Sequence, residues 1–144
     1  MQQKIAIVGA GSVGCYLGGC LTANGVDVIL VGRERIQRQL TMFGLRVTAW
    51  RGRDQSMQIE QLQFSVSMDS ISDADYILLT VKSGDTESAA ESILEYAKAS
   101  AVVVSFQNGT QNVATLKAKL PNHKILKAMV PFNVLNNGEG QFHC

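Results

Sequence analysis

The chain has 144 residues, of which 46% are hydrophobic and 17% are charged, and its formal net charge is +1. This length and this hydrophobic content suffice for one domain with a single core. The balanced charge gives no reason to expect a nucleic acid or a membrane surface as partner, and no apolar run approaches the roughly 20 residues that cross a bilayer.

Strand-like and helix-like segments alternate along the chain. Apolar runs rich in β-branched residues predict parallel strands over residues 4–8, 27–31, 76–81, 101–106 and 125–130. Helical patterns occupy the intervals, over residues 12–24, 35–42, 86–99 and 110–120. This βαβ alternation predicts an α/β fold, a Rossmann-type doubly wound and mostly parallel sheet with helices on both faces.

Local signals mark several helix ends. Asn24-Gly25 is a good C-terminal stop for the first helix, and Pro121 stops the last one. The third helix has possible N-caps in Ser83, Asp85 and Thr86.

Residues 44–66 have a different pattern. Apolar and polar side chains partly alternate over residues 44–50 and again over 58–66, and residues 51–54 (Arg-Gly-Arg-Asp) have the composition of a turn. We predict that 44–50 and 58–66 form a hairpin-like insertion beside the main sheet.

A G-x-G-x-x-G motif follows the first predicted strand directly and opens the first helix. It consists of Gly9, Ala10, Gly11, Ser12, Val13 and Gly14. In this context Gly9 permits a tight turn, Gly11 lets a pyrophosphate approach the backbone, and Gly14 lets the helix pack closely on the strand. The first amides of the helix and its dipole would then face the phosphates. The alternative is a glycine-rich turn without a ligand, and the strand-turn-helix context favours a dinucleotide site.

The end of the second strand indicates which dinucleotide. NAD-binding members of this fold place an acidic residue there, to hold the ribose 2′-hydroxyl. Here the strand leads into Gly32 and Arg33, and a guanidinium can donate two hydrogen bonds to a 2′-phosphate. This favours NADP (NADPH), with Arg35 as a second possible contact. Two alternatives remain: Arg33 can be a solvated loop cation, and Glu34, if it points inward, can hold a 2′-hydroxyl instead.

The cysteines and histidines indicate no further chemistry. Cys15, Cys20 and Cys144 form no C-x-x-C pair, so we expect reduced thiols in a cytoplasmic protein, with the first two as packing residues of the first helix. His123 and His143 are too few and too isolated for a metal site, and none is expected.

Two later segments carry a resemblance. Residues 78–82 (LLTVK) and 105–109 (SFQNG) end neighbouring strands, and residues 129–134 (MVPFNV) precede Asn137-Gly138. Together with the glycine motif and Arg33, they resemble the ketopantoate reductase (2-dehydropantoate 2-reductase) family over essentially the whole chain.

The resemblance implies roles for individual residues. Lys82 matches a lysine that contacts the cofactor near the nicotinamide-side ribose, and Asn108 matches an asparagine at the meeting point of nicotinamide and substrate. Asn133 and Val134 match a segment that lines the cofactor through backbone groups. From the residues alone, Lys82 can also be a solvated surface cation, and Asn108-Gly109 can be a turn and helix cap.

The resemblance also implies an activity, the NADPH-dependent reduction of 2-dehydropantoate, a small 2-keto acid, to pantoate on the route to pantothenate and coenzyme A. In the family, a second, helical domain carries the lysine that acts as general acid and a glutamate that binds substrate. Residues 1–144 contain no match to either. We therefore expect an N-terminal dinucleotide-binding domain, truncated before the second domain, that has no catalytic residue of its own, binds NADPH weakly and reduces nothing.

Alternative functions remain open at this point. One is a dinucleotide-binding sensor module without chemistry, and another is a reductase of a different 2-keto acid, because the substrate is selected mainly by the second domain. Apolar surface that normally packs against that domain would favour self-association, for example as a dimer.

Overall fold

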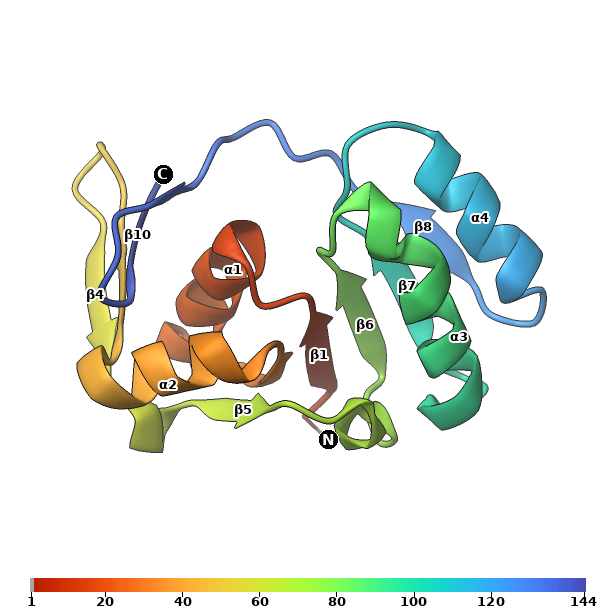
Figure 1. Cartoon of the computed structure of the whole chain (residues 1–144), viewed down its shortest axis with the longest axis horizontal. Coiled ribbons are helices and arrows are strands. Elements are labelled where there is room, and N and C mark those ends of the chain that lie inside the picture. Colours follow the sequence, from red (N-terminus) through yellow and green to blue (C-terminus); the bar gives the residue numbers. More distant parts are fainter. Residues whose placement is uncertain (1) are drawn as a thin grey trace.

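The computed structural model describes residues 2–144 and contains a six-stranded main sheet in the order β5-β2-β1-β6-β7-β8 (Figure 1). All neighbouring strands of this sheet are parallel. Its strands are β1 (Lys4–Val8), β2 (Asp27–Val31), β5 (Gln63–Ser65), β6 (Tyr76–Leu79), β7 (Val102–Ser105) and β8 (Ile125–Lys127). When only the strands of this sheet are numbered along the chain, their order is 3-2-1-4-5-6. This is the order of dinucleotide-binding doubly wound folds, so the predicted Rossmann-type fold is confirmed.

Helices cover both faces of the main sheet. Successive residues of a strand point to opposite faces, and apolar side chains of the strands are buried on each face. On one face, Ile7 and Leu30 join the buried residues of α1 (Ser12–Ala23) and α2 (Glu34–Phe43). On the other face, Ala6 and Val8 join those of α3 (Thr86–Tyr96) and α4 (Gln111–Lys119). The core is thus divided into two apolar layers by the sheet.

A second sheet covers the outer side of α1. It has the order β4-β3-β10-β9, with β3 (Leu45–Thr48), β4 (Asp54–Met57), β9 (Leu135–Asn136) and β10 (Gln141–His143). Two glycines of α1 allow the close packing on each side. A Cβ at Gly18 would lie 2.5 Å from Leu30 of the main sheet, and a Cβ at Gly19 would lie 2.7 Å from Val47 of the second sheet.

The predicted hairpin exists, but the prediction that residues 58–66 form its second strand was wrong. β3 pairs antiparallel with β4, from Leu45 opposite Met57 to Thr48 opposite Asp54. Residues 58–66 instead contain the 3₁₀ turn η1 (Ile59–Gln61) and then β5, which pairs in parallel with β2 at the edge of the main sheet. Alternating polarity indicates a half-buried strand and says nothing of its partner, which explains the error.

Several predicted boundaries also differ. β6 ends at Leu79 and β8 at Lys127, earlier than residues 81 and 130. The 3₁₀ turn η3 (Ser83–Asp85) precedes α3; Asp85 occupies the N-cap position, but no side chain caps this helix. α3 ends at Tyr96, before the predicted residue 99, and another 3₁₀ turn, η2 (Met68–Ile71), precedes β6. The C-terminal strands β9 and β10 were not predicted.

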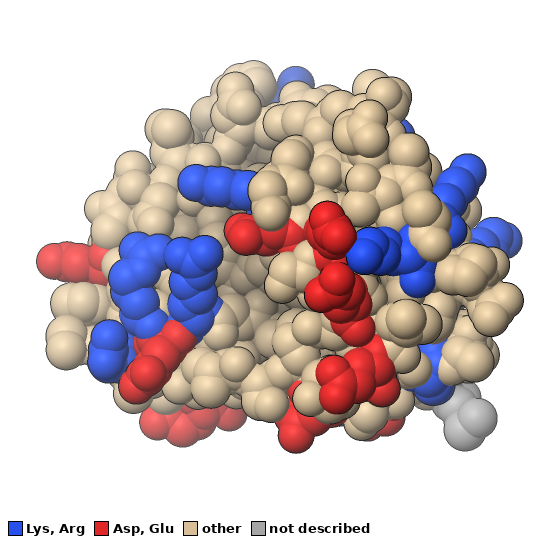
Figure 2. Space-filling model, turned by 45° about the vertical axis from the view of Figure 1, so that its right-hand side comes forward, with Lys and Arg blue, Asp and Glu red and all other residues tan. Residues whose placement is uncertain are grey.

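Charged side chains of both signs share the surface. On the face in Figure 2, acidic side chains form a band with basic ones beside it. Lys119 of α4 pairs with Glu87 and Glu91 of α3, at 3.0 and 3.4 Å. Within residues 2–144, no helix has the length and hydropathy needed to cross a bilayer, and no three His, Cys, Asp or Glu side chains are grouped as a metal site would require.

Candidate functional site

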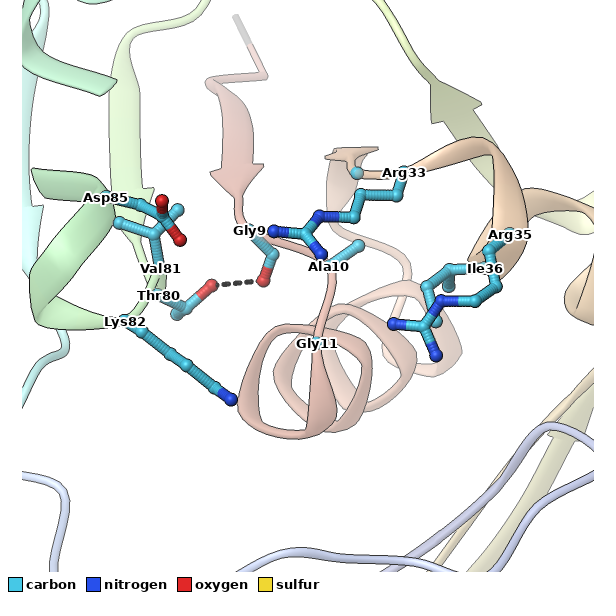
Figure 3. A pocket seen from close by; sticks show the side chains of 11 residues that line it. Gly9, Ala10, Gly11, Arg33, Arg35, Ile36, Thr80, Val81, Lys82 and Asp85 are labelled. Atoms are coloured by element: carbon cyan, nitrogen blue, oxygen red, sulfur yellow. Dashed lines mark hydrogen bonds between the residues drawn. The ribbon is translucent and has the colours of Figure 1, made fainter. Parts of the chain in front are cut away.

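A cleft of about 210 Å³ opens at the carboxyl ends of β1, β2 and β6. The strand order reverses between β1 and β6, and ligands of open α/β sheets bind at such a switch point. The lining residues come from the loops after these three strands: Gly9, Ala10, Gly11, Gly32, Arg33, Arg35, Ile36, Thr80, Val81, Lys82 and Asp85 (Figure 3).

The turn after β1 is held from both sides. The amides of Gly9 and Ala10 donate to the Val31 carbonyl at 3.0 and 3.1 Å. The Thr80 hydroxyl donates to the Gly9 carbonyl at 2.6 Å, the bond drawn in Figure 3. Gly9 has φ +106°, and a Cβ there would lie 2.7 Å from the Val81 nitrogen. Both the backbone conformation and the lack of space therefore require glycine, as expected for the tight turn.

Helix α1 starts at the floor of the cleft. Gly11 is its N-cap residue, so the amides of Ser12, Val13 and Gly14 have no acceptor within the helix and form its positive end. A Cβ at Gly14 would overlap the Gly9 carbonyl oxygen and lie 2.8 Å from the Thr80 hydroxyl, which confirms the predicted close packing of helix and strand.

Gly11 differs from Gly9 and Gly14 in its surroundings. A Cβ built on it meets no atom within 4 Å, so the space beside it is open. Its φ of −89° and ψ of −153° lie in the extended region, which other residues also adopt. Neither packing nor backbone conformation requires glycine at this position. The open space lies where a phosphate would approach the free amides of α1, so the turn fits a pyrophosphate.

The cleft is mainly basic. The Arg33 guanidinium points into it from the loop after β2, and the Lys82 side chain reaches it from the opposite loop, after β6 (Figure 3). Arg35 adds a third cation, and Asp85 is the single acidic lining residue. The excess of positive charge in the lining attracts anions.

Glu34 does not line the cleft. Its carboxylate lies 3.6 Å from the Arg38 guanidinium, one helical turn along α2, and both side chains are exposed. The inward orientation considered for Glu34 is therefore not observed.

The structure brings together only part of the predicted site. Gly9, Ala10, Gly11, Arg33 and Lys82 share the cleft, whereas Ser12, Val13, Gly14, Asn108 and Val134 are not among its lining residues. Asn108 is exposed in the loop after β7. Val134 packs at the margin of the apolar layer around α1, in a segment that crosses from β8 to the second sheet at the carboxyl edge of the main sheet (Figure 1).

The same segment contacts α1 directly. The Phe132 ring lies 6.1 Å from that of Tyr16, centroid to centroid, with the planes tilted by 46°. Burial raises the pKa of Tyr16 to about 12, and that of the neighbouring Cys15 thiol also to about 12. Cys15 is fully buried, as predicted for a packing residue.

Sequence reasoning missed Thr80 and Asp85 as cleft residues. It also missed four buried polar side chains behind the cleft: Ser105, Thr86, Gln107 and Asn112. A signal for Thr80 was present, since it is a hydroxyl residue near the end of the apolar predicted strand 76–81, at the edge of the sheet where ligands bind. For the four buried residues there was none, because Gln and Asn near a strand end resemble ordinary loop residues.

Comparison with known proteins shows which proteins the chain is similar to. The family model for ketopantoate reductase PanE/ApbA matches residues 5–144. A 2-dehydropantoate 2-reductase from Archaeoglobus fulgidus is 34% identical over 110 residues, 76% of this chain and 34% of that protein. The crystal structure of a PanE/ApbA family ketopantoate reductase from Ralstonia eutropha has a TM-score of 0.86 and 35% identity, over 98% of this chain and 46% of its own.

A further solved structure is D-mandelate dehydrogenase with NADH and anilino(oxo)acetate. It has a TM-score of 0.79 and 24% identity, over 98% of this chain and 45% of its own, a likeness that concerns the fold alone. The chain spans less than half the length of each of these relatives.

Proposed function

The chain belongs to the ketopantoate reductase PanE/ApbA family, an oxidoreductase family, and from this we propose that its cleft binds NADPH for the reduction of 2-dehydropantoate. In this proposal, residues 1–144 are the N-terminal dinucleotide-binding domain of a cytoplasmic enzyme. The observation that carries the proposal is the presence of the open Gly11 turn and the Arg33 guanidinium in one cleft.

Each part of the cleft has a counterpart in the dinucleotide. The free amides of Ser12, Val13 and Gly14 would bind the pyrophosphate, with Gly9, Ala10 and Gly11 forming the turn against it. Arg33 would bind the 2′-phosphate, with Arg35 as a second contact. Lys82 would bind the nicotinamide-side ribose from the opposite loop. Asn108 would lie at the nicotinamide and the substrate, and the backbone at Val134 would complete the site.

The charges favour NADPH over NADH. NAD-binding members of this fold hold the ribose 2′-hydroxyl with an acidic residue at the end of β2. Here the acid nearest to that position, Glu34, pairs with Arg38 outside the cleft. The groups that do line the cleft there, Arg33 and Arg35, are donors with a permanent positive charge. Two cations are suited to the charge of a 2′-phosphate and gain little from a hydroxyl.

When bound, NADPH supplies a hydride to the keto carbon of the substrate. The residues of this chain bind and orient the dinucleotide at the carboxyl edge of the sheet. Lys82 is assigned to binding, and the proton for the developing alkoxide would come from the second domain of a whole family member. We therefore propose that residues 1–144 alone bind NADPH and have no turnover.

Titration with NADPH and NADH, followed by nicotinamide fluorescence, tests this proposal. A charge-assisted, bidentate hydrogen bond contributes about 1.5–3 kcal/mol, so Arg33→Gln should weaken NADPH binding about 10- to 150-fold and leave NADH binding nearly unchanged. Arg51→Gln is the matched control, because Arg51 lies over the Trp50 ring in the turn of the hairpin, away from the cleft. Equal binding of both dinucleotides, unchanged by Arg33→Gln, would contradict the NADPH assignment.

A second candidate is an NADH-dependent reductase of another 2-keto acid. The observation behind it is that the fold shared with D-mandelate dehydrogenase holds NADH in that protein. Tighter binding of NADH than of NADPH by the unaltered chain would support this candidate.

A further inference from the structure

Four buried polar side chains lie behind the cleft, between the end of β7 and the first turns of α3 and α4. Ser105, Gln107, Thr86 and Asn112 are between 0% and 6% exposed. Polar groups at this depth destabilise a protein unless all of them are hydrogen-bonded. Here their bonds form one connected network.

The hydrogen bonds of the network all run in one direction. The Ser105 hydroxyl donates to Gln107 Oε1 at 2.8 Å, and Gln107 Nε2 donates to Thr86 Oγ1 at 2.8 Å. The Thr86 hydroxyl in turn donates to Asn112 Oδ1 at 2.8 Å. Each hydroxyl and each amide oxygen of the chain of bonds has a partner, so the four side chains fix one another's orientation.

The network ends on the two loops at the carboxyl edge of the sheet. Gln107 Nε2 also donates to the Val81 carbonyl at 3.0 Å. Asn112 Nδ2 donates to the Ser83 hydroxyl at 3.1 Å and to the Asn108 carbonyl at 2.9 Å. Val81 and Ser83 flank Lys82, which lines the cleft. The same few groups therefore hold the Val81 carbonyl and the Ser83 side chain, on either side of Lys82, together with the Asn108 carbonyl.

We infer that Thr86 and Asn112 are positioning residues for the cofactor: they hold the loops after β6 and β7 in the geometry in which one half of a dinucleotide is bound. This inference rests on the proposed function. Thr86 is the central member, because its hydroxyl accepts from Gln107 and donates to Asn112. A residue whose role is only to stabilise the core would affect all ligands alike.

The network reaches only one side of the cleft. Arg33 belongs to the loop after β2, and none of the hydrogen bonds of the network ends on that loop or on Gly9, Ala10 or Gly11. Adenosine 2′,5′-bisphosphate carries the phosphates assigned to Arg33 and to the glycine turn, and it lacks the nicotinamide half. Its affinity should therefore be insensitive to the network, whereas that of NADPH should depend on it.

Thr86→Val tests the inference, since it keeps the shape of the side chain and removes both hydrogen bonds of the hydroxyl. We expect NADPH binding to weaken about five- to tenfold and the affinity for adenosine 2′,5′-bisphosphate to change less than twofold. Thr86→Ser restores the hydroxyl and should restore NADPH binding. Equal weakening of both ligands, or no change in either, would overturn the inference.

Hydrogen exchange of backbone amides gives a readout that does not depend on a ligand. In Thr86→Val, the amides of Asp85 and Phe106, which are hydrogen-bonded to the Lys82 and Leu79 carbonyls, should exchange faster, and the amide of Gly32, which is bonded to the Ser65 carbonyl, should not change. A uniform increase in exchange rate over the whole chain would mean that the network contributes only to global stability, and it would overturn the inference. If the unaltered chain binds neither ligand, the proposed function fails, and the inference fails with it; a failure confined to Thr86→Val leaves the proposed function intact.

Discussion

Replacing Gly11 by alanine should remove dinucleotide binding without unfolding the protein. The new methyl group would enter a space that contains no protein atom within 4 Å. The backbone there is extended, so alanine adopts it without strain. A Gly→Ala exchange at a compatible position stabilises the folded state by about 0.4–1 kcal/mol, because it restricts the unfolded chain. We expect a melting temperature that is unchanged or a few degrees higher.

Binding should respond in the opposite sense. The methyl group would occupy the space in which a phosphate approaches the amides at the start of α1. Loss of about two charge-assisted hydrogen bonds, at about 1.5–3 kcal/mol each, corresponds to at least about a 100-fold weaker complex. Thermal melting of the free protein and fluorescence titration with NADPH measure the two effects separately.

Gly84→Ala is the matched control for Gly11→Ala. A Cβ at Gly84 also meets no atom within 4 Å, and Gly84 lies close to Lys82 without lining the cleft. This variant should show the same unchanged or slightly higher melting temperature as Gly11→Ala, and it should bind NADPH like the unaltered chain. If Gly11→Ala bound NADPH as tightly as Gly84→Ala does, the phosphates would not lie against the Gly11 turn, and the reasoning about this cleft would be refuted.

Three further predictions concern packing, ionisation and reactivity. Gly14→Ala should lower the free energy of unfolding in urea by about 1–3 kcal/mol, since its methyl group would collide with the backbone of Gly9; an unchanged midpoint would contradict the packing described. The hydrogen bonds that Asp75 accepts from Lys98 and from the Lys4 amide lower the pKa of its carboxyl below 3.8, so its contribution to stability is present above that pH and is lost as the pH falls through the lowered value. The difference in unfolding free energy between the unaltered chain and Asp75→Asn should therefore shrink between about pH 6 and about pH 3, and a difference independent of pH would count against the assignment. Burial raises the pKa of the Cys15 thiol to about 12, so iodoacetamide should label it far more slowly than the half-buried Cys144 in the native protein; equal rates by peptide mass spectrometry would disprove its burial.

The sheet and the glycine turn were predictable because their signals are local. Ile5, Ile7 and Val8 form an apolar, β-branched run, and the glycine spacing places the turn and the start of α1 within the next few residues. Partners that depend on long-range pairing were not predictable from such signals. β10 pairs in parallel with β3, nearly 100 residues earlier, and nothing in Gln141–His143 specifies that partner.

The candidate site also has a part that local signals predict and a part that they do not. The cleft includes the residues that directly follow β1, β2 and β6, since the fold itself brings those positions together. Asn108 follows β7, one strand further along the sheet, and lies outside the lining. The buried network could not be predicted from the sequence, because its members become hydrogen-bond partners only when α3 and α4 pack beside each other.

The strand that was assigned to the wrong sheet supports the loop that carries Arg33. β5 pairs with β2, and directly beyond this pairing the Gly32 amide donates to the Ser65 carbonyl at 3.1 Å. A Cβ at Gly32 would lie 2.5 Å from the Ala10 methyl group and 3.1 Å from the Phe64 ring. The loop that carries Arg33 is thus fixed between the glycine turn on one side and β5 on the other. The direction of the guanidinium into the cleft therefore depends on a pairing across more than 30 residues, which is why the sequence pointed to Arg33 but did not reveal what holds it in place.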